Sequence, residues 1–242
     1  MPRRTAREPS SCASTHVPTP LPRRPARIVC LEGPSAVGKS ALAAALAREA
    51  GARIVPELDA GTAPSIPDSA SWFVERHVAQ WRRARALAAA APLVVVDGDP
   101  FKGLWYNWIY AADGWPAVHM VAPLYRARVA AGELAFPDLY VVLGATEGEL
   151  RQRRAGDVTR PRRNFERHLL LVEPQRRYFA ALASADPARV LWLDTGDREG
   201  LVGAILASVT ELPSAPPDSM LLLDRMADWV RMESGGQADE HR

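Results

Sequence analysis

The sequence predicts an α/β fold, a three-layer α/β/α arrangement with a mostly five-stranded parallel sheet and an added C-terminal helix. Short apolar segments alternate with longer helical patterns along most of the chain, and strands separated by helices pair in parallel with helices on both faces. The segment 94–96 is entirely apolar, as expected for a strand covered on both faces. The 242 residues suffice for one such domain.

Each element follows from local patterning. We expect strands at 27–32, 53–55, 93–96, 138–143 and 190–193. Helices are expected at 39–49, 69–91, 101–112, 124–131, 147–154, 164–185, 199–211 and 220–232. Gly51 is placed to end the first helix, and Pro92 stops the second, because proline cannot continue a helix.

Composition divides the chain into three parts. Residues 1–26 are rich in Arg and Pro and have no apolar period, which predicts a disordered N-terminal extension. Residues 27–211 form the predicted domain, and 212–242 supply a linker, a helix and a polar tail. The extension lacks the apolar core of a secretory signal, and two cysteines, Cys12 and Cys30, suit a reducing compartment. We therefore expect a cytoplasmic location.

Charge narrows the classes of partner. Residues 1–27 hold six Arg and one Glu, leaving 24 basic and 27 acidic residues in the remainder of the chain, which is therefore slightly acidic. A slightly acidic remainder argues against nucleic acid as a partner. No uninterrupted run of 18 apolar residues is present, which argues against a membrane span. A small-molecule partner is expected, and a homodimer is left open.

The strongest motif is Gly33-Pro34-Ser35-Ala36-Val37-Gly38-Lys39-Ser40, which matches G-x-x-x-x-G-K-[ST]. It lies between a predicted strand and a predicted helix, where backbone N–H groups and the helix N-terminus can surround a phosphate chain. All eight residues are predicted to bind nucleotide. Lys39 is expected to reach the β- and γ-phosphates of ATP, and the Ser40 hydroxyl to ligate Mg²⁺.

Carboxylates follow two other predicted strands. Asp97 ends the strand 93–96, beside the phosphate loop, and is predicted to help hold Mg²⁺. Glu57 follows Val55-Pro56 and is predicted to accept the proton of a substrate hydroxyl. Asp99, in Asp97-Gly98-Asp99-Pro100, is a further candidate for substrate contact. Simple turn or solvent-exposed roles stay open for all three.

An arginine cluster suggests a lid. Between residues 151 and 167 the sequence has seven Arg and only two acidic residues. This density of positive charge favours bound anions such as transferring phosphoryl oxygens. We expect a lid at about 151–165, with Arg154 and Arg160 as the candidate catalytic arginines and the other arginines solvated.

The acceptor is expected opposite the phosphates. Trp72, Arg76 and Gln80 share one face of a predicted helix, and Phe101 begins an aromatic stripe with Trp105 and Trp108. Core packing is the stronger interpretation of that stripe, but Phe101 is kept with the other four candidates for acceptor contact. The histidines, His168 among them, have no ligand spacing.

Together these residues resemble the P-loop kinases of nucleosides, nucleotides and small molecules. Val55-Pro56-Glu57 is similar to the post-strand glutamate of deoxynucleoside kinases, and the resemblance implies that Glu57 acts as base. Those enzymes and thymidylate kinases carry Glu-Arg or Asp-Arg after the third strand, whereas this chain has Asp97-Gly98-Asp99. Chloramphenicol phosphotransferase-like enzymes share the phosphate loop, so a natural-product acceptor is open.

The predicted function is ATP-dependent phosphoryl transfer to a hydroxyl or phosphate of a small molecule. ATP and Mg²⁺ are the expected cosubstrate and cofactor. The alternative is a regulatory or assembly ATPase with the same phosphate loop and no small-molecule acceptor.

Overall fold

The computed structural model describes residues 26–58, 63–66, 69–156, 165–195 and 200–239. Five strands form one sheet in the order β2-β3-β1-β4-β5, and every neighbouring pair is parallel. The strands are β1 (Arg27–Glu32), β2 (Arg53–Val55), β3 (Leu93–Asp97), β4 (Leu139–Gly144) and β5 (Val190–Asp194). The predicted α/β class and all five predicted strands are confirmed.

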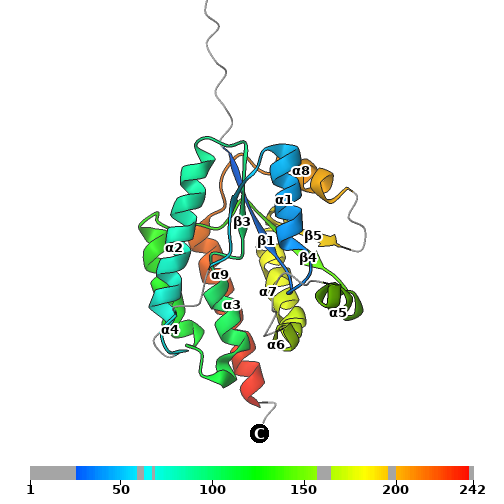
Figure 1. Ribbon diagram of the computed structural model, residues 1–242. Helices are drawn as coiled ribbons and strands as arrows, with labels where there is room; N and C mark the ends of the chain where they lie inside the picture. Colours follow the sequence, from blue (N-terminus) through cyan, green and yellow to red (C-terminus); the bar gives the residue numbers. More distant parts are fainter. Residues whose placement is uncertain (1–25, 59–62, 67–68, 157–164, 196–199, 240–242) are drawn as a thin grey trace, which may run out of the picture.

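Helices cover both faces of the sheet (Figure 1). On one face α1 (Lys39–Ala50) packs with α8 (Leu201–Glu211), and α5 (Glu147–Gly156) adds one buried leucine to the same core. The other face carries five helices: α2 (Ser69–Ala88), α3 (Lys102–Ile109), α4 (Val118–Ala130), α7 (Val172–Ala185) and α9 (Ser219–Asp239). A short helix, α6 (Phe165–Leu169), precedes α7.

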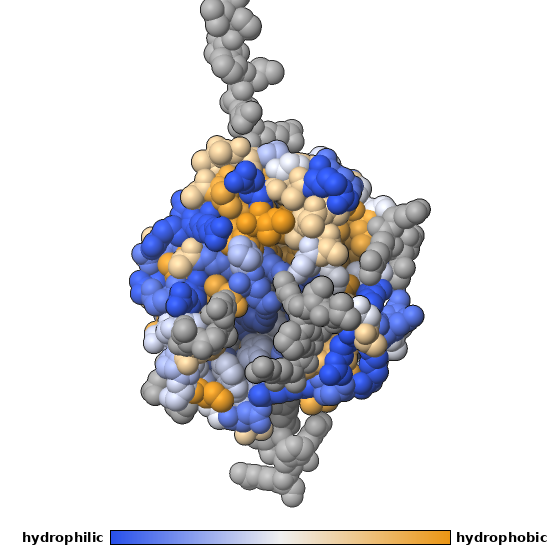
Figure 2. Space-filling view, viewed as in Figure 1, coloured by the Kyte–Doolittle hydropathy of each residue, from blue (hydrophilic) through white to orange (hydrophobic). Residues whose placement is uncertain are grey.

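The strands alternate their side chains between two cores, as the two-residue period of a strand requires. In β1, Val29 and Leu31 face the α1 side, while Ile28 and Cys30 face the α2 side. The central position of β1 puts its carboxyl end, and hence the loop that follows it, in the middle of the sheet edge. Among the described helices, none has the length and apolar character to cross a bilayer. The surface in Figure 2 is mostly hydrophilic around a central hollow.

The prediction of one helix over 164–185 is wrong, because α6 ends at Leu169 and α7 begins at Val172. Pro174 gives the reason. In a continuous helix its missing N–H and its ring would disrupt the bond to the carbonyl of Leu170. As the third residue of α7, Pro174 lies in a first turn, where backbone N–H groups have no intrahelical partner.

The start predicted for the helix at 124 is also wrong, since α4 begins at Val118 and contains Pro123. Val118, Val121 and Tyr125 are buried at helical spacing. Burial of these three side chains against the core outweighs the cost of one proline inside the helix.

Candidate active site

The turn between β1 and α1 has the backbone of a phosphate-binding loop. Gly33 has φ 137° and Gly38 has φ 112°, both in the region that favours glycine. A Cβ atom at Gly33 would lie 2.5 Å from the carbonyl oxygen of Leu143. Ala36 also has a positive φ, 69°. The motif glycines are therefore required by the close approach of β4 and by the curvature of the loop.

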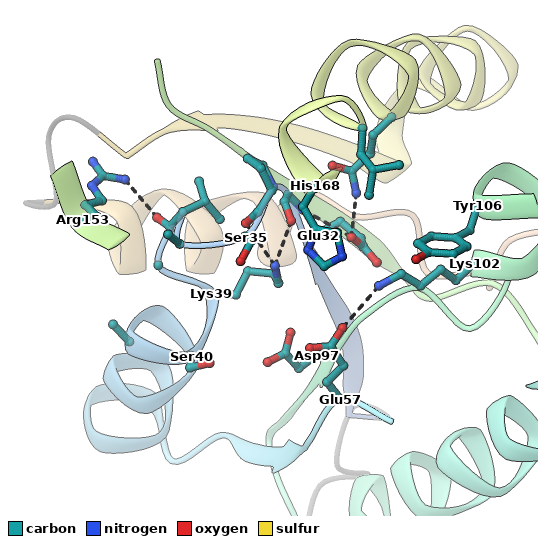
Figure 3. Close-up of a pocket in the computed structure, with 18 of the residues that line it drawn as sticks. Glu32, Ser35, Lys39, Ser40, Glu57, Asp97, Lys102, Tyr106, Arg153 and His168 are labelled. Carbon is teal, nitrogen blue, oxygen red and sulfur yellow. Dashed lines mark hydrogen bonds and ion pairs between the residues drawn. The ribbon is translucent and has the colours of Figure 1, made fainter. Parts of the chain in front are cut away.

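Lys39 lies across this loop. Its Nζ donates to the carbonyl of Gly33 at 2.8 Å and to that of Pro34 at 3.4 Å (Figure 3). These carbonyls hold the ammonium beside the loop amides, where an anionic ligand would compete for it.

The loop forms one end of a cavity of about 340 Å³. Figure 3 shows Arg153 at one side of this cavity and Lys102 and Tyr106 at the other. The cavity therefore joins the phosphate loop to side chains from β1, β3, α3, α6 and α7. The lining residues are Glu32, all eight residues of the motif, Ala41, Glu57, Asp97, Lys102, Trp105, Tyr106, Arg153, His168, Leu171 and Gln175.

Ser40 and Asp97 are oxygen donors in the same cavity. Within the described residues, Oδ1 of Asp97 is buried and has no hydrogen-bond partner. Burial raises the pKa of Asp97, and the Glu57 and Glu32 carboxylates add to the effect against the opposing Lys39 ammonium. An unpartnered buried carboxylate oxygen beside a hydroxyl fits a hard cation such as Mg²⁺.

Glu57 follows β2 and lines the cavity near Asp97. Its Oε1 lies 3.3 Å from Nζ of Lys102. Burial acts to raise the pKa of Glu57, but the Lys102 and Lys39 ammoniums outweigh it and hold the pKa below its usual value. Glu57 is therefore a carboxylate that stays ionised at neutral pH, as a proton acceptor must be.

Gln80 does not line the cavity but braces two elements of it. Its Nε2 donates to the carbonyl of Pro56 at 2.9 Å and to that of Asp97 at 3.3 Å. One amide thus ties the segment that carries Glu57 to the end of β3. The structure supports a bracing role for Gln80. Its predicted contact with the acceptor stays a prediction.

Two other predicted substrate residues lie in the core. Asp99 is 1% exposed and accepts hydrogen bonds from the Phe101 N–H, the Trp105 indole and the Tyr140 hydroxyl. Phe101 has no exposed surface and stacks on Phe136 with ring centroids 3.9 Å apart. Neither residue lines the cavity.

Trp72 and Arg76 pair with each other on α2, with the guanidinium 4.8 Å from the ring centroid, and neither lines the cavity. Their predicted contact with the acceptor stays a prediction. Trp105 and Trp108 are 1% and 3% exposed and pack in the core, while Trp105 also lines the cavity.

The arginine cluster divides into different roles. Arg153 lines the cavity and donates to the carbonyl of Val37, to Oγ1 of Thr195 and to the carbonyl of Thr195. Arg154 instead pairs with Glu166 at 3.0 Å and lies over Phe165. Arg160 and most of the predicted lid lie outside the described residues. Arg153 therefore joins the candidates, and the catalytic roles of Arg154 and Arg160 stay predictions.

Sequence reasoning missed Glu32, which is 1% exposed at the end of β1. Its two carboxylate oxygens accept from the backbone N–H of Asp99 at 2.5 Å, from Gln175 Nε2 at 2.8 Å and from the Gly33 N–H at 3.3 Å. Glu32 thus connects the phosphate loop, the turn after β3 and α7. Its signal in the sequence was a carboxylate that ends an apolar strand directly before the motif.

His168 was also missed, because a lone histidine carries no spacing signal. It lies on the cavity wall (Figure 3). Neither ring nitrogen has a hydrogen-bond partner among the described residues. Burial lowers the pKa of His168, and the Lys102 ammonium adds to this effect, so the imidazole is neutral at pH 7.

The sequence matches no family model and no curated protein, but its structure matches solved ones. Deoxyadenosine kinase from M. mycoides with bound dATP superposes with a TM-score of 0.55 at 13% identity, over 75% of this chain and 98% of that one. The same enzyme with dCMP and a flexible dCDP gives 0.52 at 12% identity, over 76% and 100%. The fold is that of the P-loop nucleoside and nucleotide kinases.

NadR in complex with NR is a further match, with a TM-score of 0.50 at 20% identity, over 81% of this chain and 54% of that chain. The P-loop kinase-like fold thus agrees with the motif in residues 33–40, and the resemblance seen in the sequence is confirmed for the fold.

Proposed function

We propose that this protein is an ATP- and Mg²⁺-dependent phosphotransferase that moves the γ-phosphoryl group to a hydroxyl or phosphate of a small molecule. The main support for the proposal is that the phosphate loop and Glu57 line the same cavity. A donor site and a proton acceptor within one cavity are what direct in-line transfer requires.

At the donor end, the loop amides and Lys39 would bind the triphosphate. Ser40 and Asp97 are the residues that would hold Mg²⁺, which neutralises charge on the phosphate oxygens when bound. Arg153 holds the loop at Val37, so the loop is shaped before a ligand arrives. Preorganised donors of this kind lower the barrier without reorganisation during the reaction.

At the acceptor end, Glu57 would orient the acceptor hydroxyl and take its proton. Its half-exposed carboxylate can reach a bound molecule, and its lowered pKa keeps it in the proton-accepting form. Asp97 is the less favoured base because its place beside Ser40 suits metal binding.

Nucleosides are the first acceptors to test, because the solved structures of similar fold include deoxyadenosine kinase. Nucleoside monophosphates and hydroxylated natural products come next, since the residues after β3 differ from the Asp-Arg or Glu-Arg pair of the nucleoside and thymidylate kinases.

The test is a panel of nucleosides, nucleotides and hydroxylated antibiotics incubated with the full chain and MgATP. ADP release and the mass of the product are measured together. A phosphorylated acceptor supports the proposal, and Lys39→Ala should abolish it while leaving the thermal melting curve unchanged. ATP hydrolysis with no phosphorylated product across the panel would favour the regulatory ATPase instead.

A further inference from the structure

The chain contains 30 basic residues, but only Lys39 and Lys102 are lysines. Both line the same cavity. Lys39 belongs to the phosphate motif, whereas Lys102 belongs to no motif and comes from a different element, the first residue of α3. In a chain that uses arginine almost everywhere else, a lysine at this position calls for a chemical reason.

Lys102 is held in place by contacts on two sides. Its Nζ lies 3.3 Å from Oε1 of Glu57 (Figure 3). The same atom lies 5.7 Å from the ring centroid of Trp105. The side chain is 28% exposed, so it is partly shielded from water. A cation over an indole ring and beside a carboxylate has few alternative positions.

The Lys102 ammonium stays protonated at physiological pH. Burial acts to lower the pKa of Lys102, but Glu32 and Glu57 outweigh it and raise the pKa above its usual value. The Lys102 side chain therefore faces Glu57 as a full positive charge over the whole physiological range.

We propose that Lys102 is a positioning residue for Glu57, holding the carboxylate turned toward the acceptor hydroxyl. This inference rests on the proposed function. An ammonium is a compact point charge with three rotatable donors, so it can hold one carboxylate oxygen and leave the other to the acceptor. A guanidinium would engage both oxygens through its rigid fork. This difference explains a lysine at position 102.

An ion pair on the surface and away from the cavity provides the comparison. Arg126 and Asp224 form such a pair on α4 and α9, with side chains 55% and 38% exposed and outside the cavity. Exposed pairs of this type contribute little to stability. Arg126→Gln is therefore a matched control, since it removes one ion pair with no route to the reacting groups.

The experiment is a double-mutant cycle on the full chain with the best acceptor from the panel. Lys102→Gln should lower kcat by roughly tenfold to a hundredfold and leave the calorimetric Kd for MgATP within about twofold of wild type. The double variant Lys102→Gln with Glu57→Gln should be no slower than Glu57→Gln alone, because Lys102 acts through Glu57. Lys102→Arg should recover only part of the rate.

Additive losses in the double variant would overturn the inference, because they would show that Lys102 acts independently of Glu57. A large loss of MgATP affinity in Lys102→Gln would also overturn it, because it would show that Lys102 acts on the phosphates. A full rate with Lys102→Arg would refute the reason given for lysine.

Melting temperatures identify a variant that fails to fold, and Lys102→Met then replaces Lys102→Gln. If wild type phosphorylates no acceptor, the proposed function itself fails, whereas an active wild type with additive variants removes only this inference.

Discussion

Asp99 closes the turn between β3 and α3, and its replacement tests how the site is held in shape. Asp99→Ala leaves three buried donors without an acceptor: the Phe101 N–H at 2.8 Å, the Trp105 indole at 3.0 Å and the Tyr140 hydroxyl at 2.7 Å. Each unsatisfied donor costs about 1–3 kcal/mol. At pH 4, where folded Asp99 is protonated, we expect a net loss of about 3–5 kcal/mol in unfolding free energy.

Asp99→Asn should cost less, about 1–3 kcal/mol, because one amide oxygen still accepts from two donors and only the contact with the Trp105 indole becomes a mismatch. Either value is a large share of the stability of a typical domain. At pH 4, where folded Asp99 keeps its proton, the hydrogen bonds give the order Ala below Asn below wild type. By pH 7 the cost of the buried charge brings wild type to or below Asp99→Asn.

The pH dependence supplies a second measure. Burial, and then the Glu32 carboxylate, raise the pKa of Asp99 to about 7, whereas an unfolded aspartate titrates near 3.9. Between these values the unfolded chain has released the proton and the folded chain retains it. The contribution of Asp99 to stability is therefore full below about pH 4 and is lost as pH rises to 7, by about 4 kcal/mol.

The assay is urea unfolding followed by tryptophan fluorescence at pH 4, 5.5 and 7. The advantage of wild type over Asp99→Asn, which has no proton to lose, should shrink across this range. An Asp99→Ala variant within about 1 kcal/mol of wild type at every pH would refute the hydrogen-bond argument. A difference between wild type and Asp99→Asn that does not vary with pH would refute the argument from burial.

Three further predictions concern the cavity. Gly33→Ala should lower the unfolding free energy by about 2–4 kcal/mol and weaken MgATP binding, because its Cβ would lie 2.5 Å from the Leu143 carbonyl. The control is Gly203→Ala in α8, where a Cβ would meet open space, and this variant should be neutral or stabilising in the same melts. The acid limb of the kcat/KM profile should lie below about pH 4.3, the usual glutamate value, because the pKa of Glu57 is lowered; a limb near pH 6 would contradict this. Arg153→Ala should weaken MgATP binding by roughly tenfold in calorimetry, since the loop loses its bond at Val37, and an unchanged Kd would show that the loop needs no such support.

Much of the cavity around the phosphate loop was predictable because its signals are local. The spacing of the motif in 33–40 sets the loop, and the apolar segments before Glu57 and Asp97 place both carboxylates at carboxyl ends of parallel strands. Carboxyl ends of parallel strands share one edge of a sheet, so these residues were expected to come together, and they do.

The rest of the cavity wall was less predictable because its residues are far apart in the sequence. Glu32, Lys102 and His168 come from β1, α3 and α6 and meet only in the folded chain. Neighbours in sequence also separate: Asp97 lines the cavity, while Asp99, two residues later, is buried under α3. Glycine at position 98, with φ 98°, turns the backbone between them.

The amino-acid sequence by itself determined the alternation of strands and helices and the loop that suits a phosphate chain, because both depend on residues within one or two turns of each other. The tertiary structure alone decided which side chains face the loop across the cavity. Burial, ion pairing and the pKa of each group there depend on distances between elements, and packing of the whole sheet and its helices sets those distances.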